Sequence, residues 1–190
     1  MQVETQELAL FRSTNAALAF AFNLKHGQYK SSAMARLMGG PNPTGRGLGG
    51  IDGAAQAGMI KCEIDALAPR IRGQIIVARF ALRELPCDCR HACCSGFRPN
   101  HEWLLAISEI AELVRTEALA GTVVNFTLRH IIVRRYFGVH ISLVDAAKAA
   151  GVDRDTASVH ASRVIGYLKT EERLALYEIE GRLKAAGIVD

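Results

Sequence analysis

The chain has 190 residues, which is the length of one domain or of two small ones. Hydrophobic residues make up 49% and charged residues 22%, a composition that is ordinary for a globular protein and argues against wholesale disorder. The net charge of +4 excludes a histone-like polycation but leaves a local basic face possible.

The longest purely apolar run, residues 16–22, is far short of the roughly 20 residues that span a bilayer. The N-terminus has no basic segment before an apolar core, which a secretory signal would require. We therefore expect a soluble, cytoplasmic protein that has no membrane partner.

Apolar spacing in the first half of the chain predicts helices over residues 14–24, 31–38, 51–67 and 70–85, with Ser13 or Thr14 as the first N-cap. The glycine-rich stretch 39–50 lacks the Lys-Ser/Thr pair and the preceding strand of a phosphate-binding loop, so we interpret it as a connector. Cys62 falls within a helical pattern, and we expect it to be a buried small apolar residue.

The other cysteines lie close together in the middle of the chain. They are Cys87, Cys89, Cys93 and Cys94. Clustered thiols in a reduced chain more often bind a metal than form disulfides, and four thiolates suit tetrahedral Zn²⁺. We expect a structural zinc site here, with His91 and His101 as substitute ligands; a metal-free cluster of reactive or disulfide-bonded thiols is the alternative.

Residues 101–119 predict a strongly amphipathic helix whose polar face is acidic, with Glu102, Glu109, Glu112 and Glu117. Basic residues outnumber acidic ones by 12 to 7 in residues 1–100 and by 10 to 8 in residues 121–190. The acidic helix therefore lies between two more basic regions, an arrangement that suits a separate face for a polyanion. Uniformly mixed surface charge is the alternative.

The last third of the chain predicts a helix over residues 124–137, ended by Gly138, followed by a helix-turn-helix. Ser142 would cap the first helix of the motif, Gly151 would form the turn and Asp153 would cap the second helix. The buried positions of the second helix would be Ala157, His160 or Ala161, and Val164. A further helix is predicted over residues 169–186, capped by Thr170 and ended by Gly187.

In a helix-turn-helix the second helix enters the major groove of double-stranded DNA. The side chains expected to face DNA are Arg154, Asp155, Thr156, Ser158, Val159, Ser162 and Arg163. Arg129, Arg134 and Arg135 at the end of the preceding helix are candidates to hold phosphates. For Arg134 and Arg135 the alternative is that their side chains point to solvent. A helical hairpin with an alanine-rich interface is the alternative.

These patterns predict an all-α, multi-helix protein with a C-terminal helix-turn-helix and a zinc-binding loop inserted between helices. We expect N-terminal helices and the glycine-rich connector in residues 1–50. A helical region with the zinc loop at 86–101 would occupy 51–120, and the DNA-binding region would occupy 121–190. No paired carboxylates, nucleophile–base pair or phosphate loop is evident, so we expect no enzyme.

The stretch Gly49 to Ile60 (GGIDGAAQAGMI), the cysteine cluster and the C-terminal motif together resemble the Q-type late-gene antitermination regulators of bacteriophages and prophages. The C-terminal part is also similar to region 4 of sigma factors. The resemblance implies binding to DNA near a late promoter and loading onto a paused RNA polymerase in a bacterial host cell. The polymerase would then read through pauses and terminators. The cysteines depart from the family pattern, because they are not two widely separated pairs.

Two other functions stay open on the sequence alone. A promoter-binding activator or repressor would use the same helix-turn-helix without altering the polymerase. A protein-interaction module with a structural zinc site would bind no DNA. The sequence leaves the oligomeric state open, since no heptad run is evident.

Overall fold

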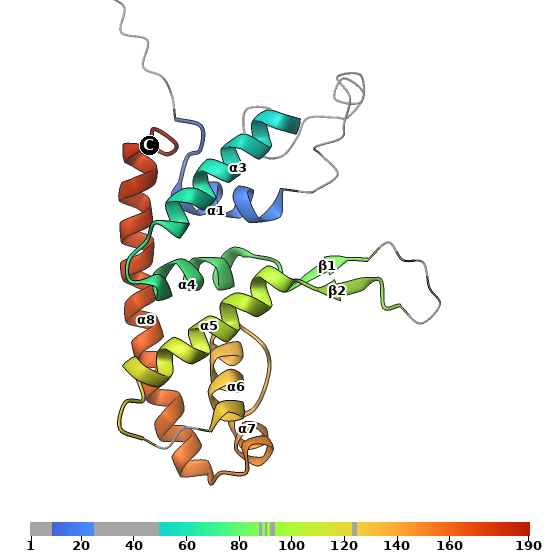
Figure 1. Ribbon diagram of the computed structural model, residues 1–190, viewed down its shortest axis with the longest axis vertical. Helices are drawn as coiled ribbons and strands as arrows, with labels where there is room; N and C mark the ends of the chain where they lie inside the picture. The colour runs from blue at the N-terminus through green and yellow to red at the C-terminus, as the bar shows by residue number, and fades with distance from the viewer. Residues whose placement is uncertain (1–8, 25–49, 88, 90, 92–93, 123–124) are drawn as a thin grey trace, which may run out of the picture. The chain divides into compact units, whose positions relative to one another are not determined.

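The computed structural model in Figure 1 describes residues 9–24, 50–87, 89, 91, 94–122 and 125–190. This part of the chain is mainly helical, as the apolar spacing predicts. The chain divides into two units, residues 1–67 with 177–190 and residues 68–176. The helix expected at 31–38 and nearly all of the connector 39–50 lie outside the described residues, and the three regions expected from the sequence stay a prediction.

The first unit is built on helices α1 (Thr14–Asn23) and α3 (Gly50–Asp65), which pack against each other. The predicted N-cap Ser13 is confirmed, because its hydroxyl accepts a hydrogen bond from the backbone N–H of Ala16 at 3.3 Å. The end of the chain joins this unit, since the backbone N–H of Phe11 donates to the carbonyl of Ile188 at 3.0 Å. The fully buried side chains of the unit include Leu18, Ile60, Ile64 and Ile179.

The expectation that Cys62 is buried is wrong, because the residue is exposed on α3. Ile60 and Ile64 are four residues apart and occupy the buried face of this helix. A residue midway between them points to the opposite side of an α-helix. The apolar character of cysteine therefore misled the prediction where helical spacing would have corrected it.

The second unit contains helices α4 (Arg70–Phe80) and α5 (His101–Glu117), which pack together. The helix predicted to reach residue 85 ends five residues earlier, because Ala81 adopts an extended conformation with ψ 141°. A short antiparallel hairpin follows, formed by β1 (Glu84–Pro86) and β2 (Phe97–Pro99), with Leu85 opposite Arg98. Strands of three residues are too short to show apolar alternation, so the sequence does not predict this hairpin.

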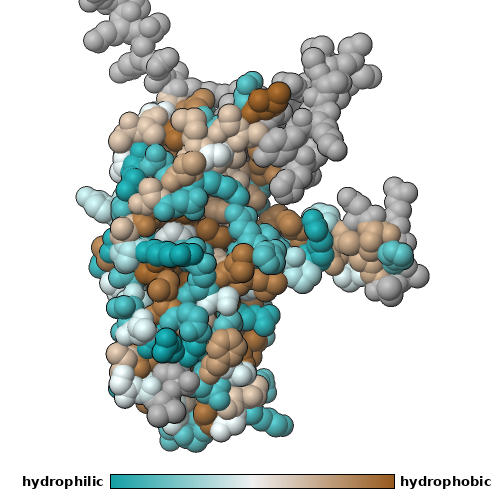
Figure 2. Space-filling model, viewed as in Figure 1, coloured by the Kyte–Doolittle hydropathy of each residue, from teal (hydrophilic) through white to brown (hydrophobic). Residues whose placement is uncertain are grey.

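Helix α5 has the amphipathic character that the sequence predicts, with Trp103, Ile107, Ile110 and Val114 on its buried face. The indole Nε1–H of Trp103 donates to the carbonyl of Ala78 on α4 at 3.1 Å. Beside the hairpin, Figure 2 shows hydrophobic surface where the strands join the helices. The exposed apolar residues of this region are Leu82, Phe97, Leu104 and Leu105.

Helices α6 (Phe126–Tyr136), α7 (Leu143–Ala150) and α8 (Arg154–Ala185) follow. The prediction of separate helices before and after residue 169 is wrong, because α8 continues through this point. The Thr170 hydroxyl donates to the carbonyl of Gly166 inside the helix at 3.2 Å and caps nothing. The predicted ends at Gly138 and Gly187 are confirmed, since both have positive φ.

Helix α8 is the longest helix of the described chain, yet charged residues recur along its length. Neither this helix nor any other in the described ranges has a segment apolar enough to cross a bilayer.

Candidate metal centre and candidate nucleic-acid interface

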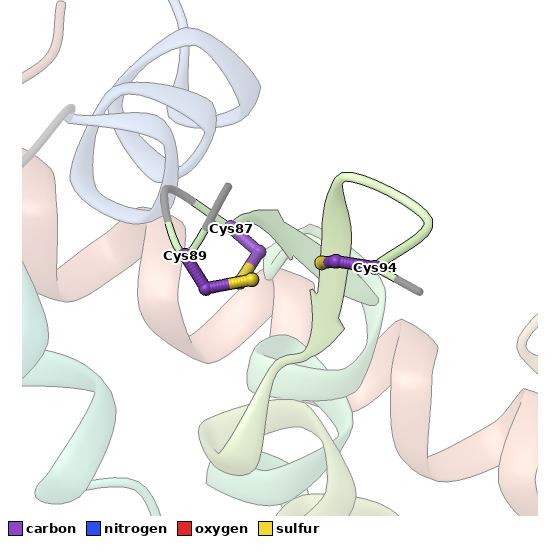
Figure 3. A group of neighbouring side chains, drawn as sticks. All are labelled: Cys87, Cys89 and Cys94. Carbon is purple, nitrogen blue, oxygen red and sulfur yellow. The ribbon is translucent and has the colours of Figure 1, made fainter. Parts of the chain in front are cut away.

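Three cysteines converge beyond the strands of the hairpin. The sulfur atoms of Cys87, Cys89 and Cys94 lie within 4.8 Å of one another (Figure 3). Cys87 follows β1 directly, and its backbone N–H donates to the carbonyl of Gly96 at 2.8 Å. The backbone N–H of Cys94 donates to the carbonyl of His91 at 3.0 Å. The first hydrogen bond joins the two arms of the chain beyond the strands, and the second closes a local turn before Cys94.

The thiols of the cluster differ in acidity. A hydrogen bond from the backbone N–H of His91, followed by those with the Cys94 and Cys87 thiols, lowers the pKa of Cys89. A hydrogen bond from the backbone N–H of Cys89 lowers the pKa of Cys87. Hydrogen bonds with the other two thiols and partial desolvation raise it by more, so the pKa of Cys87 is raised overall. The cluster therefore favours a thiolate at Cys89, and thiolates are the form in which cysteine binds metals.

The structure brings together three of the residues predicted as ligands. Cys93 lies outside the described residues. His91 is exposed and His101 begins α5, and neither joins the group that the three thiols form among the described residues. Sulfur atoms bound to one zinc at about 2.3 Å lie roughly 4 Å apart, so the observed spacing fits a single soft metal ion.

Both ends of α7 and the start of α8 are capped, as the sequence predicts. The Ser142 hydroxyl accepts a hydrogen bond from the backbone N–H of Asp145 at 3.0 Å. Gly151 ends α7 in the left-handed conformation, with φ 64° and ψ 33°. The Asp153 carboxylate then accepts hydrogen bonds from the backbone N–H groups of Asp155 and Thr156, each at 2.9 Å. Three residues thus connect two well-defined helices.

In the first three turns of α8, buried and exposed residues follow the pattern that the sequence predicts, with one exception. The residues predicted as buried are confirmed, namely Ala157, His160, Ala161 and Val164. Six of the residues predicted to face DNA are exposed: Arg154, Asp155, Ser158, Val159, Ser162 and Arg163. Thr156 is half-buried, and its hydroxyl hydrogen-bonds to the Asp153 carboxylate. That hydrogen bond is the main cause that lowers the pKa of Asp153.

The three arginines predicted on α6 have different environments. Arg134 and Arg135 are exposed, and Arg135 lines a shallow hollow together with His140 and Ser142. The expectation that Arg129 holds a phosphate is wrong. Its side chain is only 4% exposed, and its guanidinium lies 2.6 Å from the Glu112 carboxylate. This arginine stabilises the contact of α6 with α5 instead.

Ion pairs between glutamates and arginines also change the interpretation of the acidic helix α5. Glu109 of α5 forms an ion pair with Arg70 of α4 at 2.8 Å, and Glu112 forms the pair with Arg129. At least two of the four glutamates therefore neutralise basic residues of the same unit. The sequence gives little sign of these pairs, because their members are 39 and 17 residues apart.

Comparison with known proteins gives no family for the chain. Neither a family model, nor a curated protein, nor a solved structure matches it.

Proposed function

We propose that the protein is a transcription regulator that binds double-stranded DNA in a sequence-specific way through α7 and α8. The observation that carries the proposal is the capped connection at Gly151, which is followed by an exposed polar face at the start of α8. This order of helix, short turn and second helix is that of a helix-turn-helix, whose second helix reads the major groove.

Free positive charge at the end of α6 and at the start of α8 supports DNA as the partner. Within the described residues, no ion pair involves Arg134, Arg135, Arg154 or Arg163, and all four side chains are exposed. Unpaired arginines of this kind contact phosphates or the O6 and N7 atoms of guanine. The alternative of a pure protein-interaction module is less favoured, because two carboxylates of its candidate acidic surface already have partners in the same unit.

The proposed role is late-gene antitermination in a bacterial host cell, with RNA polymerase as the second partner. The resemblance in the order of parts supports this role: GGIDGAAQAGMI, then the cysteine cluster, then the helix pair. In a transcription assay with a paused polymerase upstream of a terminator, we expect the protein to increase read-through. If it binds the promoter region and changes initiation alone, the protein is an ordinary activator or repressor.

The proposed metal is zinc in a structural role, and the residues present fit it. Three thiols at mutual distances within 4.8 Å match the ligand that zinc prefers, and the sequence of residues 87–96 has only one apolar residue besides its cysteines, Ala92, too few to build a core of its own. Cys87, Cys89 and Cys94 would hold the ion, with Cys93 as the predicted fourth ligand. Zinc would supply a fixed crosslink between the two arms of the hairpin.

DNA binding is tested first by selecting sites from a library of random duplexes with the full chain. On a selected duplex, we expect Arg154→Ala to weaken binding roughly five- to 150-fold in a fluorescence anisotropy titration and to relax the sequence preference. The expected size follows from about 1–3 kcal/mol for an arginine that contacts guanine. Arg173→Ala is the matched control, because Arg173 is exposed on the same helix outside the proposed face. Equal affinity of both variants and the parent chain would reject the recognition face.

Zinc is tested by elemental analysis of the reduced protein and by counting reactive thiols before and after chelation. We expect about one zinc per chain and a gain of reactive thiols on chelation, which Cys89→Ser reduces and Cys62→Ser does not. Protein without metal, whose cluster thiols all react freely, would reject the zinc site.

A further inference from the structure

The three described thiols of the cluster differ in their access to solvent. Cys89 is exposed, whereas Cys87 and Cys94 are partly buried. All three sulfur atoms lie within 4.8 Å of one another, so a small movement of one side chain brings two of them to the roughly 2.05 Å of a disulfide bond. An exposed thiol with two close neighbours is the arrangement in which oxidation stops at a disulfide and does not proceed to irreversible acids.

We propose that the cluster is a site of reversible oxidation by peroxide, in which Cys89 and Cys94 form a disulfide and the bound metal is released. The loss of metal rests on the proposed zinc site, whereas the disulfide rests on the geometry of the thiols alone. This modification would make the crosslink between the hairpin arms respond to the redox state of the surroundings.

The reaction takes two steps, with hydrogen peroxide as the oxidant. The Cys89 sulfur attacks one peroxide oxygen, the O–O bond breaks, and Cys89 becomes a sulfenic acid while hydroxide leaves. The Cys94 thiolate then attacks the Cys89 sulfur; the S–S bond forms, the S–O bond breaks, and the leaving oxygen departs as water after protonation. Two electrons pass from the sulfur atoms to the peroxide, and the metal loses two thiolate ligands.

The choice of Cys94 as the second residue follows from the hairpin (Figure 3). Cys87 and Cys89 are separated by one residue on the same arm, and a disulfide between them would close a small, distorted ring. Cys87 is also held beside β2 by the hydrogen bond from its N–H to the carbonyl of Gly96. Cys94 lies on the other arm, and the chain between it and Cys89 is long enough to close a ring without such distortion.

The test treats the full chain with hydrogen peroxide, once zinc-loaded and once reduced and metal-free. We expect zinc release, followed with a colorimetric chelator, to parallel a Cys89–Cys94 link found by peptide mass mapping. A thiol reductant should reverse both changes. Cys62→Ser should behave as the parent chain. Cys89→Ser, tested metal-free with its helical content checked by circular dichroism, should form at least tenfold less disulfide.

The zinc-loaded and metal-free treatments separate the two proposals. If the chain never binds zinc but forms the Cys89–Cys94 disulfide, the zinc site is rejected and the oxidation proposal stands. If the chain binds zinc and retains it with its thiols intact, the oxidation proposal is rejected and the zinc site stands. Sulfinic or sulfonic acids without a disulfide, or a disulfide through Cys62, Cys87 or Cys93, also overturn the proposal.

Discussion

At the scale of single residues, burial decides what an arginine can do. Arg129 and Arg134 lie five residues apart on α6, yet the first is buried against Glu112 and the second is exposed. Within the described part of the chain, the Nε atom of Arg129 has no hydrogen-bond partner. The Glu112 carboxylate and the face of the Phe126 ring, 5.6 Å from the guanidinium carbon, are therefore what stabilises this charge.

We expect Glu112→Ala to lower the free energy of unfolding by about 1–3 kcal/mol, because it leaves a buried guanidinium without its counter-charge. Glu112 is itself half-exposed, which reduces the effect below that of a fully buried pair. The control is Glu109→Ala on the same helix, whose partner Arg70 is 73% exposed; its cost should stay below about 1 kcal/mol. Urea titrations that give equal losses for the two variants would contradict this difference.

The residue scale is also where sequence reasoning succeeded and failed most clearly. Ser142, Gly151 and Asp153 were predictable, because caps and turns depend on a few neighbouring residues. The burial of Arg129 was not, because it depends on a glutamate that another helix supplies. The closeness of Cys87, Cys89 and Cys94 could be expected from their spacing, but a hairpin with this register could not.

At the scale of elements, the boundaries of α7 and α8 depend on backbone conformation at glycine. Gly151 has φ 64°, a conformation that costs other residues free energy, whereas Gly166 lies inside α8. A Cβ added at either position would meet no atom within 4 Å. The two glycines therefore differ in backbone conformation, whereas both have room for an added Cβ atom.

We expect the same substitution to have opposite signs at these positions. Gly151→Ala should lower the free energy of unfolding by about 1 kcal/mol, because alanine resists the left-handed conformation. Gly166→Ala should raise it by about 0.5–1 kcal/mol, because alanine favours the helix interior. Thermal or urea unfolding of both variants measures the difference. Stabilisation by Gly151→Ala would mean that α7 does not end in the left-handed turn.

The sequence predicted elements correctly where an amphipathic pattern repeats over many residues. It failed for the short strands of the hairpin and for the uninterrupted helix α8. Helix α5 was predictable from its repeated apolar face. The hairpin was missed because each strand has only three residues, and α8 was divided because Thr170 has the residue type of a cap. A threonine caps a helix only where the backbone leaves the helical conformation, and this conformation is set by packing beyond the local sequence.

At the scale of the whole molecule, charge connects distant parts of the chain. In the unit formed by residues 68–176, Glu172 of α8 pairs with Arg79 of α4 at 2.6 Å and accepts a hydrogen bond from the hydroxyl of Tyr136 on α6. Desolvation raises the pKa of Glu172, but the hydrogen bonds from Arg79 and Tyr136 outweigh it and lower the pKa overall. Burial, followed by the hydrogen bond to Glu172, raises the pKa of Tyr136.

This cluster predicts acid sensitivity. A carboxyl whose pKa is lower in the folded state stabilises the fold above its unfolded pKa of about 4.3, and that stability is lost as the pH falls through the folded value. Between pH 6 and pH 3 the free energy of unfolding should therefore fall more steeply in the parent chain than in Glu172→Gln. The variant should also be less stable at pH 7. Glu117→Gln, an exposed position in the same unit, is the control and should keep the parent slope.

The internal pairing of arginines has a consequence for how binding to DNA should respond to salt. Arg70, Arg72, Arg79, Arg129 and Arg182 each lie within 4 Å of a glutamate, so they release few counterions from a nucleic acid. Four of the residues proposed to contact DNA stay exposed without an ion pair in the described part of the chain: Arg134, Arg135, Arg154 and Arg163. If each contacts one phosphate, at about 0.9 counterions per contact, a plot of log affinity against log salt concentration should have a slope of about −4 per chain. The net charge of +4 gives no hint of this value, because it counts paired and unpaired arginines alike.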